Sequence, residues 1–88
     1  MNDEETFFTF PCEYPIKVIG YTADDFEILV LSIVKAHVKE LTEHCFSSRL
    51  SKDGKYTSIT ITFTAESKAQ LDALYRDLTR HEQVLTVL

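Results

Sequence analysis

The chain has 88 residues, of which 44% are hydrophobic and 26% charged, as is typical of one small globular domain. Its net charge is −5, and Asp3, Glu4 and Glu5 supply three of those charges, so residues 7–88 carry only −2. Without a basic stripe a nucleic-acid backbone has nothing to dock on, and an acidic balance disfavours an anionic membrane surface. We therefore expect no nucleic-acid partner and no membrane association.

The cysteine and histidine content indicates neither a metal nor a cofactor. Cys45 follows His44 directly, and neighbours on a strand point to opposite faces, so the two cannot chelate one ion together. Cys12, His37 and His81 lie on separate predicted elements without ligand spacing. The sequence leaves a Cys–His nucleophilic pair open, although Cys12 in its apolar stretch is typical of a packing residue. With no signal-peptide core, the cysteines are expected to be free thiols in the cytoplasm.

The N-terminal residues divide into two parts. Residues 1–6 are polar and acidic and are predicted to be a disordered tail, followed by a single domain over residues 7–88. Three phenylalanines, Phe7, Phe8 and Phe10, would expose a large apolar surface if this terminus were free. We therefore expect them to pack onto that domain.

The first strand is predicted over residues 14–20, where Ile16 and Val18 share one face and Lys17 and Ile19 share the other. A glycine ends it. A helix is then predicted over residues 23–39, and its apolar stripe consists of Phe26, Leu29, Val30, Ile33 and His37, broadened by Leu31, Val34 and Val38. The pair Thr22 and Asp25, three residues apart, predicts a capping box at its start.

The second strand is predicted over residues 43–50, with Phe46 and Leu50 facing inward. An Asp53-Gly54 turn joins it to the next strand, and Gly54 is expected at positive φ. That next strand alternates apolar and polar residues, which predicts a central strand with one covered face. Its inward residues are Ile59, Ile61 and Phe63, and its outward residues are Ser58, Thr60, Thr62 and Thr64.

A second capping box, Ser67-x-x-Gln70, predicts a helix that continues to about Arg80. The last strand is predicted over residues 84–88. The sequence does not decide which of its residues face the core, because Val84 with Leu88 and Leu85 with Val87 compete for the inward positions.

The predicted order β-α-β-β-α-β is that of the α+β ferredoxin-like sandwich, with a four-stranded antiparallel sheet and two helices on one face. Over residues 10–88 the chain resembles the YbeD-like family of small bacterial proteins. The resemblance rests on FPCEYPIKVIG (10–20), YTSITI (56–61) and QLDALY (70–75), leading to VLTVL (84–88). It implies a ferredoxin-like fold close to regulatory ACT domains and a link to lipoate metabolism, with no assigned catalytic residues.

Two candidate sites follow from this fold. The outward positions of the central strands carry no aromatic side chain, which disfavours base stacking. The loop after the first strand lies at a helix N-terminus, where a small anion can bind, and its candidate ligand-binding residues are Lys17, Gly20, Tyr21 and Thr22. The alternative interpretation of this loop is a turn, a cap and a packed tyrosine.

The last strand is the other candidate, as an interface. It has no charge, Pro or Gly to stop another strand from pairing with its edge, and the interface residues would be Val84, Leu85, Val87 and Leu88. The N-terminal phenylalanine segment is the alternative cover for this edge. The sequence favours a non-catalytic regulatory or protein-binding module, with an ACT-type sensor of amino-acid, acyl or lipoyl ligands as the second hypothesis. An enzyme is disfavoured, because no acid–base pair or nucleophile stands in a recognisable arrangement.

Overall fold

The computed structural model describes residues 9–39, 41 and 45–88. The elements are β1 (Cys12–Tyr21), α1 (Phe26–His37), β2 (Phe46–Leu50), β3 (Tyr56–Ala65), α2 (Lys68–Thr79) and β4 (Val84–Val87). The predicted order is confirmed. The predictions for the acidic tail, for Phe7 and Phe8 and for His44 lie outside the described residues.

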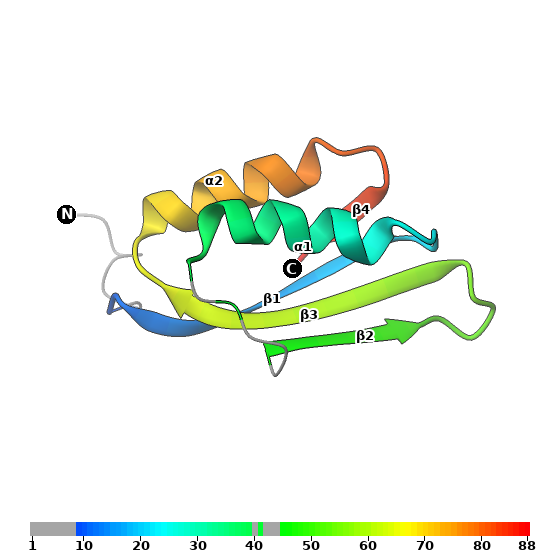
Figure 1. Cartoon of the computed structure of the whole chain (residues 1–88), viewed down its shortest axis with the longest axis horizontal. Helices are drawn as coiled ribbons and strands as arrows, with labels where there is room; N and C mark the ends of the chain where they lie inside the picture. The colour runs from blue at the N-terminus through cyan, green and yellow to red at the C-terminus, as the bar shows by residue number, and fades with distance from the viewer. Residues whose placement is uncertain (1–8, 40, 42–44) are drawn as a thin grey trace.

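The four strands form one antiparallel sheet in the order β2-β3-β1-β4, and both helices cover the same face of it (Figure 1). β1 and β3 pair along their whole length, from Cys12 opposite Ala65 to Tyr21 opposite Tyr56. The fold class and the central place of these two strands are therefore as the sequence predicted.

The core lies between the sheet and the helices. Even-numbered residues of β1 and odd-numbered residues of β3 face it, because side chains alternate along a strand. The side chains with no exposed surface include Ile16, Val18, Phe26, Val30, Val34, Ile59, Ile61, Leu74 and Leu78. The inward residues predicted for β3 are thus confirmed.

Helix α1 differs from the prediction in its start and in its buried line. It begins at Phe26 behind Asp25, which makes no side-chain cap, and the Thr22 hydroxyl instead bonds the Thr57 hydroxyl at 2.8 Å. The predicted Thr22 capping box is wrong, because the turn over residues 23–25 separates that threonine from the helix. The buried positions recur every four residues, at Phe26, Val30, Val34 and Val38, so the predicted stripe was centred too far to one side.

Helix α2 begins as predicted. The Ser67 hydroxyl accepts the backbone N–H of Gln70 at 3.1 Å, and the Gln70 side-chain oxygen accepts the backbone N–H of Glu66 at 2.7 Å. These two bonds satisfy N–H groups that have no partner within the helix.

The β2–β3 hairpin confirms the predicted turn and the inward side of Leu50, although this side chain is not buried. Gly54 has φ +75°, and Asp53 accepts bonds from the Ser51 hydroxyl and the Lys55 N–H, the latter being the main reason that the pKa of Asp53 is lowered. Leu50 lies opposite the buried Thr57 and so stands on the inward side, as predicted, but it is 60% exposed. It stands at the hairpin end of an edge strand, where a neighbouring strand flanks it on one side only.

Strand β4 contains a bulge that decides its facing. Val84 lies opposite Gly20 and Thr86 opposite Ile19, so β4 uses one more residue than β1 over this step. Val84 and Val87 both turn toward the core as a result, while Leu85 and Leu88 are exposed. Neither of the two simple alternations considered from the sequence is correct.

Candidate functional site

The loop after β1 uses two of its predicted ligand-binding residues internally. A Cβ on Gly20 would lie 2.3 Å from the backbone oxygen of Gln83 and 2.5 Å from the Phe26 ring, so this glycine permits close packing. Thr22 is held by the Thr57 hydroxyl and by a backbone bond to Lys55 at 2.9 Å. Both residues contribute to the architecture of the loop, although not as the turn and helix cap of the alternative interpretation, because Gly20 lies within β1 and Thr22 does not cap α1.

Tyr21 belongs to a different surface. It lies directly opposite Tyr56 on the sheet face that no helix covers, and the two ring centroids are 5.9 Å apart with a 34° tilt. The prediction that no aromatic side chain lies on the outward face of the central strands is wrong. β1 and β3 continue one or two residues further than predicted and bring both tyrosines onto it.

Lys17 also lies on the open face, in a row across three strands. It is opposite Thr60 of β3, which is opposite Ser47 of β2. In the next row, Ile19 of β1 lies opposite Ser58 of β3, which lies opposite Arg49 of β2. A hollow of about 270 Å³ lies over these rows, lined by Lys17, Ser47, Ser48, Arg49, Ser58 and Thr60. Sequence reasoning missed Arg49, because its position one row away from Lys17 on the same face depends on strand pairing.

The predicted interface residues of β4 separate into two pairs. Val84 is buried and Val87 packs against the core, whereas Leu85 is 45% exposed and Leu88 is 64% exposed. Lys17 and Leu88 exchange two backbone bonds, of 2.8 and 3.0 Å. Because such pairs alternate in an antiparallel ladder, the N–H and C=O of Val87 point away from β1, toward the outer edge.

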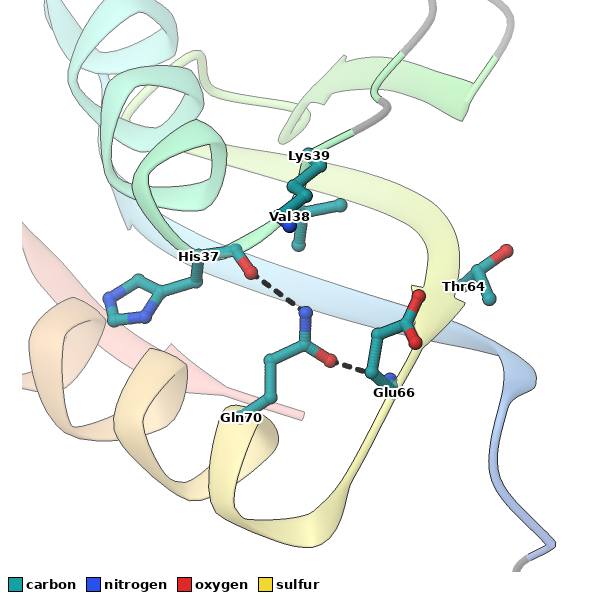
Figure 2. Close-up of a pocket in the computed structure, with 6 residues that line it drawn as sticks. All are labelled: His37, Val38, Lys39, Thr64, Glu66 and Gln70. Atoms are coloured by element: carbon teal, nitrogen blue, oxygen red, sulfur yellow. Dashed lines mark hydrogen bonds between the residues drawn. The ribbon is translucent and has the colours of Figure 1, made fainter.

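A larger hollow of about 420 Å³ lies where α1 ends, β3 ends and α2 begins; Figure 2 shows its six lining residues. Gln70 crosses it: its amide nitrogen donates to the backbone oxygen of His37 and its oxygen accepts the N–H of Glu66, both at 2.7 Å. The Gln70 side chain is therefore already used to join the two helices, and its amide groups are not available to a ligand. Lys39, Thr64 and Glu66 supply further polar side chains to the lining.

The His37 ring points away from Gln70 in Figure 2 and meets α2. Its Nε2 lies 2.6 Å from the Asp77 carboxylate, and this hydrogen bond is the main cause that lowers the pKa of Asp77. An imidazole held by a carboxylate is one half of a catalytic arrangement, but no Ser, Thr or Cys is bonded to this ring among the described residues. We interpret the pair as a contact between α1 and α2.

Within the described part of the chain, no three His, Cys, Asp or Glu side chains are grouped so that they could hold a metal ion. No helix there is long and apolar enough to cross a membrane.

The fold is of the ferredoxin-like class, close to ACT domains. It matches the solution structure of protein HP0495 from Helicobacter pylori with a TM-score of 0.74 at 15% identity, over 92% of this chain and 85% of that one. It also matches the solution structure of the ACT domain from GTP pyrophosphokinase of Chlorobium tepidum, with a TM-score of 0.68 at 14% identity, over 88% and 83% of the two chains. At such identities these matches show the fold alone.

The chain belongs to the bacterial family described as "Protein of unknown function (DUF493)", whose model matches residues 5–88. A UPF0250 protein of Chromobacterium violaceum is 38% identical over the full length of both chains. A UPF0250 protein of Neisseria gonorrhoeae is 38% identical over 99% of this chain and 96% of its own, and one of Nitrosomonas europaea is 39% identical over 97% and 98%. The expected YbeD-like membership and ACT-like fold are confirmed.

Proposed function

We propose that this protein is a non-catalytic regulatory module of the bacterial cytoplasm that acts by binding another protein chain, either a second copy of itself or a partner, along the edge of β4. The observation that carries the proposal is the outer edge of this strand. The Val87 backbone groups point outward there, and two exposed leucines flank them.

The shape of β4 supports strand addition over a short length. The bulge between Val84 and Thr86 twists one end of the edge, and bulges usually hinder pairing. The other end, at Val87 and Leu88, keeps a regular ladder with β1. An added strand would therefore pair first with this regular end and cover Leu85 and Leu88 with apolar side chains of its own.

Leu85→Lys tests the proposal, because a charge beside the edge disfavours pairing whatever the partner. Ile28→Lys is the matched control: Ile28 is 70% exposed on α1, so the same charge is added to an exposed apolar site away from the sheet edge. Light scattering over a range of concentrations measures self-association, and a pull-down from bacterial cytosol measures partner capture.

We expect Leu85→Lys to weaken association or capture while Ile28→Lys leaves both unchanged. Both variants must keep the wild-type circular dichroism spectrum. If association and capture are equal in wild type and Leu85→Lys, the β4 edge is not the interface.

A second candidate is a small-molecule sensor that uses the loop after β1, with amino-acid, acyl or lipoyl ligands. The exposed Tyr21, 52% accessible beside Tyr56, favours it, whereas the internal contacts of Gly20 and Thr22 do not. A thermal-shift screen of amino acids, lipoate and octanoate tests this candidate and its link to lipoate metabolism. A Tm that stays constant with every ligand counts against it.

A further inference from the structure

The open face of the sheet carries a cluster of hydroxyl groups between two cations. Register places Lys17, Thr60 and Ser47 in one row and Ile19, Ser58 and Arg49 in the next. The two cations thus stand at diagonally opposite corners of the hollow. With strands about 4.8 Å apart and about 3.3 Å per residue, their Cα atoms are separated by roughly 12 Å. Their long side chains can both reach the space above Thr60 and Ser58.

The polar side chains of this cluster have no polar partner among the described residues. Lys17 and Arg49 form no ion pair with any described residue, and the hydroxyls of Ser47, Ser58 and Thr60 form no hydrogen bond with one. The carboxylate on the same face of β1 nearest in sequence, Glu13, is four residues from Lys17, or about 13 Å along the strand. Two cations without an ion-pair partner in the described part of the chain are unexpected in a protein of net charge −5.

We propose that this hollow binds the phosphate group of a small molecule. A tetrahedral dianion presents acceptor oxygens in several directions, which suits hydroxyl donors below it and a cation on either side. A carboxylate has two oxygens in one plane and would leave part of this set unused. The overall acidity of the chain disfavours a long polyanion, so a single phosphate group is the class of ligand that fits.

The tyrosine pair decides between two sources of that phosphate. Tyr56 and Tyr21 form the row immediately beyond Ser58 and Arg49, on the same face. A phosphomonoester with a planar ring can place its phosphate in the hollow and its ring on the tyrosines, whereas inorganic phosphate uses the hollow alone. Lys17 adjoins the β4 edge through its two backbone bonds to Leu88, whereas the other polar groups of the hollow lie on β2 and β3. The phosphate proposal requires no strand to be added at that edge, so it is tested independently of the proposed function.

The experiment is a titration of the backbone amide signals of the full chain by NMR at pH 7.5. The three probes are inorganic phosphate, adenosine monophosphate and adenosine, each at ionic strength held constant with NaCl. We expect saturable shifts at Lys17, Ser58 and Thr60 with both phosphates. Additional shifts at Tyr21 and Tyr56 with the monophosphate, together with tighter binding, identify a ring-bearing ester as the source. If inorganic phosphate and adenosine monophosphate bind with equal affinity and the tyrosine signals do not shift, the ligand is free phosphate.

Three variants show whether the named groups hold the ligand. Lys17→Gln and Arg49→Gln should each weaken phosphate binding about tenfold, since each removes a charge-assisted bond. Thr60→Val keeps the shape and the strand preference of the side chain and should weaken binding by a smaller factor. Lys35→Gln is the matched control, because Lys35 is an exposed cation on α1, away from the open face. It should bind as wild type does.

Several results would overturn the proposal. These are shifts that do not saturate, shifts reproduced by NaCl alone, adenosine binding as well as its monophosphate, and equal weakening by Lys35→Gln and Arg49→Gln. A variant with an altered fold shows changed signals throughout the spectrum before any ligand is added. In that case Thr60→Val and the Lys35→Gln control decide the outcome.

Discussion

The two faces of the central strands differ in almost every respect although the same residues' backbones build both. On the covered face, Ile16, Val18, Ile59 and Ile61 have no exposed surface. On the open face, most residues of these two strands are polar or are tyrosines, including Lys17, Ser58 and Thr60, although Ile19 also lies there. Most of the favourable free energy of folding therefore comes from burial of the covered face. The open face is therefore free to carry chemistry without a large cost in stability.

The covered face also fixes the geometry of the open one. A slip of one residue between β1 and β3 would turn an entire set of apolar side chains to solvent, so burial determines the register. That register in turn sets which polar residues stand side by side. Lys17 lies beside Thr60 because Ile16 and Ile61 are paired in the core.

The largest expected effect comes from neighbouring residues on β3 that face opposite ways. Ile61→Ala leaves a cavity in the core and should lower the free energy of unfolding by about 2–5 kcal/mol. Thr60→Ala changes the open face and should lower it by less than about 1 kcal/mol. Urea unfolding of both variants measures the difference. Similar midpoints for the two would show that the faces have been assigned the wrong way round.

A smaller effect is expected where the covered face has no room. Gly20→Ala places a methyl group against the Gln83 backbone oxygen and the Phe26 ring, at 2.3 and 2.5 Å. The backbone must shift, which should destabilise the protein by about 1–3 kcal/mol. Thermal unfolding followed by circular dichroism measures this effect. An unchanged Tm would mean that β1 and the start of α1 are further apart than described.

The hairpin turn belongs to neither face and isolates the cost of backbone conformation. A Cβ on Gly54 meets no atom within 4 Å, but the residue has φ +75°. Gly54→Val should therefore cost about 1–2 kcal/mol from strain alone. Gly54→Asn, which tolerates this conformation, is the matched control and should cost less. Equal urea midpoints for wild type and Gly54→Val would contradict the positive φ.

The smallest effect is a dependence on pH in the layer that covers the sheet. The hydrogen bond from His37 lowers the pKa of Asp77 below its ordinary value of 3.8. The ionised carboxylate thus stabilises the fold above about pH 4, and this contribution is lost as the pH falls through the lowered pKa. The advantage of wild type over Asp77→Asn should shrink on acidification below pH 4.

Asp72→Asn is the control for that experiment, because Asp72 lies on the same helix and, among the residues that the structure describes, pairs only with the exposed Lys68. Its difference from wild type should change less over the same range. Urea unfolding at a series of pH values measures both variants. If the difference in free energy of unfolding between wild type and Asp77→Asn stays constant or grows toward low pH, the His37–Asp77 hydrogen bond is not the cause of the pH dependence.

Much of the fold could be predicted because it depends on local patterns. The alternation around Ile59 and Ile61 identifies a central strand, Ser67 and Gln70 identify a helix start, and Gly54 identifies a turn, each from neighbours in sequence. The order of elements then leaves one common topology. The candidate sites were predicted less completely, since Lys17 and Tyr21 were named but Arg49 and Tyr56 were not.

The sequence by itself determined which side of each central strand faces the core, because a period of two is a property of the strand alone. Tertiary structure decided which residues of different elements lie together: Lys17 beside Thr60 and Ser47, Tyr21 beside Tyr56, and His37 beside Asp77. It also decided the bulge in β4, which turns Val84 and Val87 to the core together. The physical reason is that an alternating pattern fixes the face of a side chain, whereas its neighbours depend on register and on packing between distant segments.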